Sequence, residues 1–379
     1  MRPLAGVRIV EISSFVAVPL AGMTLAQLGA EVVRIDPAGG AADYHRWPVT
    51  TAGESIYWAG LNKGKRSMEV DMRSAGGQEL VQRLIAAAGV FITNVAGRQW
   101  HSYQTLSGLR PDLIALEVVG RADGATGVDY TVNAATGFPL VTGPADHVGP
   151  VNHVMPSWDV SCGLYAALSI LAALRRRDAT GAGSNIRLPL DDVALATAAN
   201  LGFLTEVMVT GEQRPRLGNA IFGQYGRDFT SSDGVSFMVV ALTARHFRDL
   251  TELTASSETV AALAQTLGAD FSDEGQRYHH REALNGVFAE WFGSHTADEV
   301  AAALGASSVL WERYRSFAEV VNSPRVQDNP LFSPVEQDRI GRYLAPGLPI
   351  SIDGAHIPAQ PAPLLGADNA AVPAEWLGR

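Results

Sequence analysis

The sequence contains the stretch Val7-Arg-Ile-Val-Glu-Ile12, followed by an apolar segment over residues 19–28 and then by Glu31-Val-Val-Arg-Ile-Asp36. The two outer stretches are rich in β-branched residues, which predicts strands. The apolar segment between them predicts a helix that Gly29 ends. A strand, a helix and a second strand at this spacing indicate a βαβ unit, in which the two strands lie parallel.

The same alternation continues through the first half of the chain. Helices are expected over residues 75–88, over 160–177, and from Asp191 onward. Further strands are expected at residues 67–71, 90–94, 113–119 and 185–190. We therefore predict an α/β fold with a Rossmann-like large domain built on a mostly parallel sheet.

A change in character near residue 211 indicates a second domain. Proline and glycine punctuate residues 211–219. Beyond them lie an apolar strand over residues 236–241 and a helix that begins with a capping box, Thr296 to Glu299. We predict a large domain over residues 1–200, completed by 325–379, a smaller α+β domain over 221–320, and linkers at 201–220 and 305–330.

Composition limits the classes of partner. The formal net charge of −10 over 379 residues argues against binding to nucleic acid, which needs a basic surface. None of the nine histidines lies at a metal-ligand spacing, so no metal is expected. Cys162 is the single cysteine, which excludes an internal disulfide and favours a cytoplasmic location. No apolar segment is predicted to be both long enough and free enough of charge to cross a membrane.

Asp159 lies at the start of the long apolar helix predicted over residues 160–177. Apolar residues recur at helical spacing but also surround this helix, so we expect it to be buried. A carboxylate in the first turn faces the positive end of the helix dipole, which keeps it ionised and suits a nucleophile. The alternative is that Asp159 only stabilises the start of the helix, with Ser157 as a rival cap.

Two other motifs bear on nucleotide binding. The link between the first strand and helix, residues 13–19, has no G-x-G-x-x-G pattern, which disfavours a nicotinamide-dinucleotide site. Asn62-Lys-Gly-Lys-Arg66 places three cations around a flexible glycine. This pattern is equally compatible with a solvated loop and with a site for a phosphate-bearing ligand.

Seven segments in order resemble the family III CoA-transferases and cover nearly the whole chain. They are Leu25–Asp36, Leu61–Ser67, Phe91–Asn94, Asp159 before its helix, Thr180–Gly183, Arg216–Asn219 and Ala362–Gly366. The family's Glu-His-Thr after the last motif is Ala367-Asp-Asn369 here, so no role is carried to those positions. Further segments resemble the branch that moves CoA between the two carboxyls of mesaconyl-CoA, namely 13–24, 44–48, 58–66, 128–133, 151–154 and 225–229.

The resemblance implies a mechanism and an assembly. Asp159 would attack an acyl-CoA thioester, forming an anhydride and then an aspartyl-CoA thioester before CoA reaches its new carboxyl. The substrate would be an acyl-CoA, with CoA as part of it and no prosthetic group, and the protein would form an interlaced, ring-like homodimer. One alternative is transfer between two acids, for example from succinyl-CoA. Another is 2-methylacyl-CoA racemisation, disfavoured because Val128 replaces the racemase histidine beside Asp129.

The resemblance also points to contact residues. Those expected to bind CoA by their position are Val16, Ala17, Pro37, Val70, Asp71, Met72, Arg73, Asn94, Val95, Ala96, Arg98 and, near the reacting group, Asp129. Arg34 and Lys63 are candidates to replace the nucleotide-binding arginine that some members have at the position of Pro37. Candidates for holding the free carboxylate of a dicarboxylate are Arg46, Tyr130, His153, Tyr225 and Arg227.

Overall fold

The computed structural model describes residues 2–95 and 97–378. The chain divides into two compact units. The described residues of 1–137, 152–212 and 323–379 form the first unit, and 138–151 with 213–322 form the second. Residues 138–151, which the sequence placed in the large domain, thus cluster with the second unit instead.

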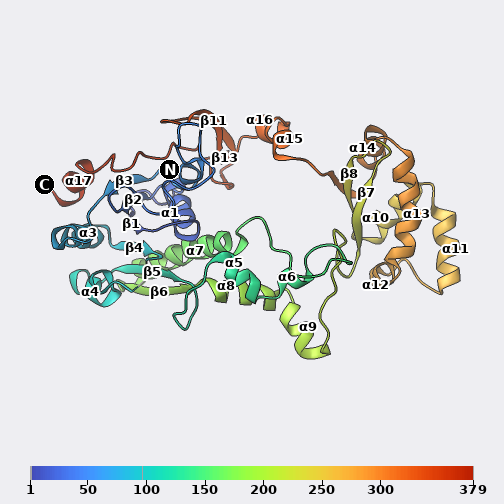
Figure 1. Ribbon diagram of the computed structural model, residues 1–379, viewed down its shortest axis with the longest axis horizontal. Coiled ribbons are helices and arrows are strands. Elements are labelled where there is room, and N and C mark those ends of the chain that lie inside the picture. Colours follow the sequence, from blue (N-terminus) through green and yellow to red (C-terminus); the bar gives the residue numbers. More distant parts are fainter. Residues whose placement is uncertain (1, 96, 379) are drawn as a thin grey trace. The chain divides into compact units, whose positions relative to one another are not determined.

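A six-stranded parallel sheet organises the first unit (Figure 1). Its strands are β1 (Arg8–Ile12), β2 (Glu31–Asp36), β3 (Arg66–Glu69), β4 (Val90–Thr93), β5 (Ile114–Val119) and β6 (Ser184–Pro189). They lie in the order β3-β2-β1-β4-β5-β6, and every neighbouring pair is parallel. The predicted α/β class and parallel sheet are confirmed.

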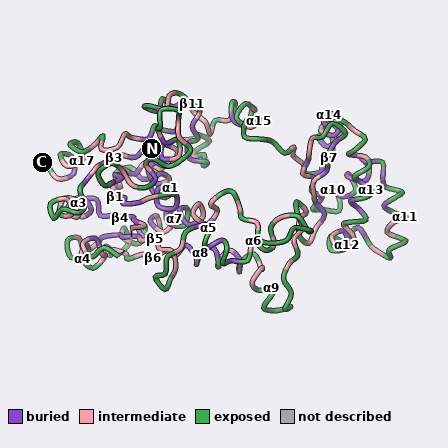
Figure 2. The backbone as a smooth tube through the Cα atoms, in the orientation of Figure 1, coloured by how far each residue is buried: buried purple, intermediate pink, exposed green. Residues whose placement is uncertain are grey.

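Helices cover both faces of this sheet (Figure 1). On one face lie α3 (Ala75–Ala88), α4 (Tyr103–Leu109) and α17 (Ala371–Leu377), and on the other α1 (Ala17–Gln27) packs against α7 (Ser157–Thr180). Alternate strand residues such as Val10, Val33 and Phe91 pack with α3, because successive side chains of a strand point to opposite faces. Figure 2 shows these central strands as mainly buried.

The strand order creates a crevice between β1 and β4. These two strands are neighbours, and from them the sheet continues outward to β2 and β3 on one side and to β5 and β6 on the other. Open α/β sheets bind ligands at such a reversal, beyond the carboxyl ends of the strands. The loops that follow β1 and β4 are therefore the expected walls of a ligand site.

The remaining elements of the first unit are short. They are α2 (Ile56–Leu61), the 3-10 turn Gln99–His101, α5 (Asp129–Ala135), α8 (Leu190–Asn200), α9 (Phe203–Thr210), α16 (Pro324–Gln327), and the paired strands β10 (Phe332–Gln337) with β11 (Gly341–Pro346) and β12 (Ser351–Ile352) with β13 (Ala355–His356). Helix α9 lies within the predicted linker 201–220.

An antiparallel sheet of β7 (Tyr225–Thr230), β8 (Ser236–Ala241) and β9 (Leu310–Arg313) organises the second unit. Its helices are α6 (Phe138–Val141), α10 (Ala244–Leu253), α11 (Ser257–Leu267), α12 (Glu274–His279), α13 (Arg281–Ser294), α14 (Ala297–Gly305) and α15 (Phe317–Val321). The capping box predicted at Thr296 and Glu299 is present at the start of α14. Strand β9 lies within the predicted linker 305–330.

Helix α7 is not buried on all sides, contrary to the prediction. Leu164, Tyr165 and Leu168 are 52%, 49% and 58% exposed, whereas Cys162 and Ile170 are fully buried. By length and composition this helix also meets the requirements of a membrane span, contrary to the expectation that no segment would. Its buried face packs against α1.

Candidate active site

Asp159 lies in the first turn of α7, where a second carboxylate organises the backbone. Asp129, the first residue of α5, is 2% exposed and accepts hydrogen bonds from the backbone N–H groups of Trp158 (2.8 Å) and Asp159 (3.2 Å). These are N–H groups that a helix start leaves without an internal partner. Ser157 is not the cap, because its hydroxyl donates to the carbonyl of Met155. Asp129 caps the helix, and no hydrogen bond within the described residues reaches the carboxylate of Asp159.

His153 holds the capping carboxylate from its other side. Its Nε2 lies 2.7 Å from Oδ1 of Asp129, in position to donate a hydrogen bond. The indole N–H of Trp158 donates to Oδ1 of Asn133 at 3.1 Å, which is a second tie between α5 and the start of α7. His153, predicted as a substrate contact, thus has a direct partner in the carboxylate that positions the Asp159 turn.

Burial and, to a lesser extent, the negative charge of Asp129 raise the pKa of Asp159 to about 6, although the positive charge of Arg46 acts in the opposite direction. The sequence predicted that the helix dipole would favour the charged form. Burial opposes this effect of the dipole and moves the pKa upward. At pH 7 the carboxyl is still mainly ionised, since the pH lies about one unit above its pKa.

A cavity of about 670 Å³ opens at Asp159, and this volume is typical of small-molecule sites. Its wall includes seven residues that the sequence singled out: Val16, Ala17, Arg46, Asn94, Asp129, Tyr130 and Asp159. The structure therefore brings the predicted nucleophile together with two candidates for binding a free carboxylate, Arg46 and Tyr130. We call this space the acyl cavity.

A second cavity of about 570 Å³ lies over the carboxyl ends of β1 and β2. The predicted CoA contacts Pro37, Met72, Arg73, Val95 and Arg98 line it. Ser14 lines both this cavity and the acyl cavity, so the two spaces meet at that residue. Together they suit a long ligand that reaches Asp159 with one end.

A model of CoA-transferase family III matches residues 4–369. The chain belongs to this family. The match confirms the family that the ordered motifs predicted, and it covers the crevice, both cavities and Asp159.

Several relatives and one solved structure of a similar protein match this chain over almost its full length. It is 46% identical to 2-methylfumaryl-CoA isomerase from Chloroflexus aurantiacus, over 99% of this chain and 94% of the relative. It is 26% identical to succinyl-CoA:mesaconate CoA-transferase from Haloarcula hispanica, over 98% of this chain and 95% of the relative. The crystal structure of a CAIB/BAIF family protein from Brucella suis is similar with a TM-score of 0.82 at 26% identity, covering 99% of both chains.

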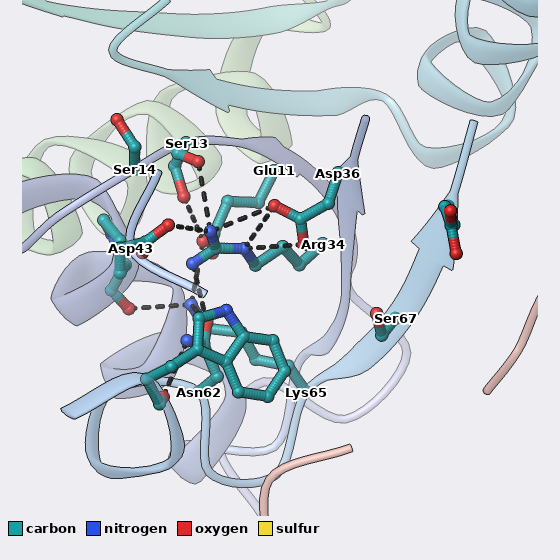
Figure 3. A network of polar contacts seen from close by, with 12 residues as sticks. Glu11, Ser13, Ser14, Arg34, Asp36, Asp43, Asn62, Lys65 and Ser67 are labelled. Carbon is teal, nitrogen blue, oxygen red and sulfur yellow. Dashed lines mark hydrogen bonds and ion pairs between the residues drawn. The ribbon is translucent and has the colours of Figure 1, made fainter. Parts of the chain in front are cut away.

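In this CoA-transferase a network of buried charges lies beside the loop that follows β1 (Figure 3). Arg34 is 1% exposed, and its guanidinium donates to the carboxylates of Asp36 and Asp43, the latter at 2.7 Å. It also donates to the carbonyl of Ser13. The prediction that Arg34 contacts CoA is wrong, because this side chain is sealed in the interior and bonded there.

The three cations of residues 62–66 are likewise bonded to other groups of the chain, two of them in the interior. The Nζ of Lys65 lies 2.8 Å from Oε1 of Glu11, and burial lowers the pKa of Lys65 to about 8. Lys63 is 5% exposed and donates to the carbonyl of Gly60 at 2.7 Å. Arg66 pairs with acidic residues of β2 and of the C-terminal segment. Neither the phosphate-site interpretation nor the CoA contact predicted for Lys63 fits these positions.

Three other predicted CoA contacts also have partners within the chain. Asn94 lines the acyl cavity, and its side chain accepts from the N–H of Ser14 (3.0 Å) and donates to the carbonyl of Ser14 (2.8 Å). Val70 is buried in the core beside α3. Asp71 accepts from the backbone N–H of Arg73 in a turn. Ala96 lies outside the described residues.

Two candidates for binding the substrate carboxylate lie in the second unit. Tyr225 is 1% exposed, packs in that unit's core and donates its hydroxyl to Oδ1 of Asn285 at 3.0 Å. A side chain so enclosed does not fit a substrate contact. Arg227 lies in β7, an edge strand of the antiparallel sheet, and a guanidinium nitrogen lies 3.7 Å from Oδ1 of Asp228.

Phe15 and Tyr57 are among the aromatic residues of the acyl cavity that sequence reasoning missed. Phe15 follows β1 in the loop that crosses the crevice, and Tyr57 lies in the first turn of α2. The available signal was their place in segments 13–24 and next to 58–66, both of which carried the resemblance. Neither aromatic residue has a sequence pattern that would mark it as part of a site.

Proposed function

We propose that this chain moves CoA between the two carboxyl groups of one dicarboxylate, from C1 to C4 of mesaconyl-CoA, through covalent intermediates on Asp159. The observation that carries the proposal is the carboxylate of Asp159, which has no hydrogen-bond partner in the described residues and opens onto the acyl cavity. The second cavity continues from Ser14 over the strand ends, where a long CoA chain has room. An acyl-CoA lying along both cavities presents its thioester to Asp159.

The chemistry follows from what a carboxylate does to a thioester. Asp159 attacks the thioester carbonyl, the C–S bond breaks, and CoA leaves as a thiolate from a mixed anhydride. The thiolate attacks the aspartyl carbonyl, the anhydride C–O bond breaks, and an aspartyl-CoA thioester and a free dicarboxylate result. The other carboxylate of that diacid then attacks the aspartyl thioester, and the same two steps in reverse give the isomeric thioester and free Asp159. These steps use only carboxylates and a thiolate, so the proposal includes no prosthetic group.

The names of the relatives support this substrate. Mesaconate and 2-methylfumarate are the same dicarboxylate, and the 46% identical relative is named as an isomerase of its CoA thioester. Migration of CoA between the two carboxyls converts one thioester into its isomer without any other reactant. An isomerase within a CoA-transferase family is therefore chemically consistent with C1-to-C4 transfer.

Incubation of the enzyme with mesaconyl-C1-CoA and no added acid tests the proposal. The C4 thioester is expected to form, and isotopically labelled free mesaconate is expected to stay out of it. Asp159→Ala should lower the rate by several orders of magnitude while circular dichroism and CoA binding persist. Full activity of that variant would exclude the proposed nucleophile.

A second candidate function is transfer between two different acids, with succinyl-CoA as the donor. The name of the 26% identical relative, a succinyl-CoA:mesaconate CoA-transferase, favours it. Under this alternative, no C4 thioester forms from mesaconyl-C1-CoA alone, and labelled mesaconate enters the product when succinyl-CoA is supplied. The experiment above therefore separates the two functions.

We also propose that two copies of the chain form the homodimer that the family resemblance implies. The exposed apolar residues of α7, Leu164, Tyr165 and Leu168, support a contact with another protein surface. A second copy that covers this face would bury the side that the single chain leaves open.

A further inference from the structure

The wall of the acyl cavity contains a cation without an acidic partner. Arg46 is exposed and lines the cavity, and no carboxylate in the described residues forms an ion pair with it. Its guanidinium carbon lies 5.2 Å from the ring centroid of Phe15 and 5.2 Å from that of Tyr57. Its positive charge opposes the upward shift in the pKa of Asp159 that burial and Asp129 cause. A cation and the nucleophile thus face the same space.

The backbone of Arg46 is fixed from both sides. Its N–H donates to the carbonyl of Asp43 at 3.2 Å, and its carbonyl accepts from the hydroxyl of Ser55 at 2.6 Å. Ser55 is also the N-cap of α2, because its hydroxyl oxygen accepts from the N–H of Trp58. The same side chain therefore sets the position of Arg46 and the start of the helix that carries Tyr57.

The second ring is held by the loop after β1. Phe15 has a φ of 65°, a left-handed backbone conformation that a bulky residue adopts only when its surroundings impose it. The side chain of Asn94 forms hydrogen bonds with both the N–H and the carbonyl of Ser14. The guanidinium of Arg34 donates hydrogen bonds to the carbonyl of Ser13 and to the carboxylate of Asp43 (Figure 3). The buried network thus ties together the loop that ends in Phe15 and the turn that leads to Arg46.

This arrangement suits a carboxylate. Stacking on aromatic rings engages the faces of a guanidinium and leaves its N–H donors for a planar anion, which arginine binds through two parallel hydrogen bonds. Burial raises the pKa of Tyr57 to about 12, so its phenol stays protonated as a further possible donor. A monocarboxylic acyl group would offer nothing to this cation, whereas a dicarboxylic one offers its free end.

We propose that Arg46, held between Phe15 and Tyr57, binds the free carboxylate of the diacid and retains the diacid between the two half-reactions. This inference rests on the proposed function. While C1 reacts with Asp159, Arg46 holds the C4 carboxylate. After the aspartyl-CoA thioester forms, both carboxylates of the diacid are free, and it turns so that C1 meets Arg46 and C4 attacks the thioester. Retention by Arg46 makes the transfer intramolecular.

The test measures how often the diacid escapes. Four proteins are incubated with mesaconyl-C1-CoA and labelled free mesaconate: wild type, Arg46→Gln, Arg46→Lys and the control Arg245→Gln. The control removes an exposed cation of α10 in the second unit. Escape of the diacid is measured as label incorporated into product plus unlabelled mesaconate released. We expect Arg46→Gln to raise the ratio of escape to C4 product by about tenfold to a hundredfold, because a charge-assisted contact is lost. Arg46→Lys should restore part of the retention, and Arg245→Gln should match wild type.

A trapping measurement tests the role of Arg46 separately from the proposed CoA transfer. Borohydride added during turnover should reduce an adduct on Asp159 in wild type and in Arg46→Gln alike. If the adduct forms but Arg46→Gln keeps the wild-type ratio of escape to isomerisation, the role of Arg46 is overturned while the transferase mechanism stands. If wild type gives neither adduct nor C4 thioester, the proposed function itself fails.

Discussion

The carboxylate of Asp129 accepts a hydrogen bond from the backbone N–H of Asp159 at 3.2 Å. One acidic residue thus fixes the backbone of another while its negative charge helps to raise the pKa of the second carboxyl. The arrangement fixes the backbone of the proposed nucleophile and leaves its carboxylate open to the acyl cavity.

The first prediction concerns the pH dependence of the reaction. Because only the ionised form of Asp159 attacks a thioester and its pKa is about 6, kcat/KM should fall about tenfold per pH unit below roughly pH 6. Initial rates with mesaconyl-CoA between pH 4.5 and 8 measure this limb. A flat profile down to pH 4.5 would contradict the raised pKa.

The second prediction concerns stability. A raised pKa means that the folded protein retains a proton on Asp159 between about pH 4 and 6 that the unfolded chain has lost, so this carboxyl lowers the free energy of unfolding as pH rises through that window. Asp159→Asn should therefore be more stable than wild type by about 2 kcal/mol at pH 7.5. The gain should vanish near pH 4. Urea unfolding at the two pH values measures it, and an equal effect at both would contradict the pKa assignment.

The third prediction separates charge from position at Asp129. Asp129→Asn removes the negative charge, so the acid limb of kcat/KM should move to lower pH. The weaker cap and the altered contact with His153 should also misplace the nucleophile and lower kcat by on the order of 10²-fold. Rate–pH profiles of the variant and wild type provide both numbers. An unchanged midpoint with normal kcat would show that Asp129 does not act on Asp159.

The fourth prediction distinguishes framework from ligand contact among the arginines. Arg34→Met should lower the free energy of unfolding by about 3–5 kcal/mol, because it leaves Asp36 and Asp43 charged and unpaired in the interior. Arg73→Gln, which changes a residue of the second cavity, should weaken CoA binding with little effect on stability. Urea unfolding and isothermal titration with CoA compare them. Loss of CoA affinity in a fully stable Arg34→Met protein would reinstate the nucleotide contact.

The fifth prediction tests the assembly. Leu168→Glu places a charge on the exposed apolar face of α7 and should shift a homodimer toward monomer, since a charge buried in an apolar interface lacks a partner. Light scattering after gel filtration measures the mass of each species. Arg245→Gln serves as a surface control, and a Leu168→Glu protein that keeps the wild-type mass would remove this face from the interface.

The strands of the large sheet could be predicted because their burial is written into runs of β-branched residues such as those of β1 and β2. Asp159 could be found because a helix start and a family motif coincide there. The direction of its pKa shift could not, because burial by residues distant in sequence decides it. The sequence suggests a ligand contact for Arg34 and leaves open a phosphate site at the segment that contains Lys65. A charged residue gives no local sign that a partner such as Asp43 or Glu11 will bond to it in the interior.

The buried network of Glu11, Arg34, Asp36, Asp43 and Lys65 sets a rule for changing this protein. Replacing Arg34, Lys65 or Glu11 leaves the charge of its partner unpaired in the interior, so we expect these three residues to tolerate substitution poorly. The side chains of Arg46, Phe15 and Tyr57 line the acyl cavity outside this network, so we expect substitutions there to leave the network in place. A change in acyl specificity is therefore best sought by substituting these three cavity residues while the buried charged residues are kept.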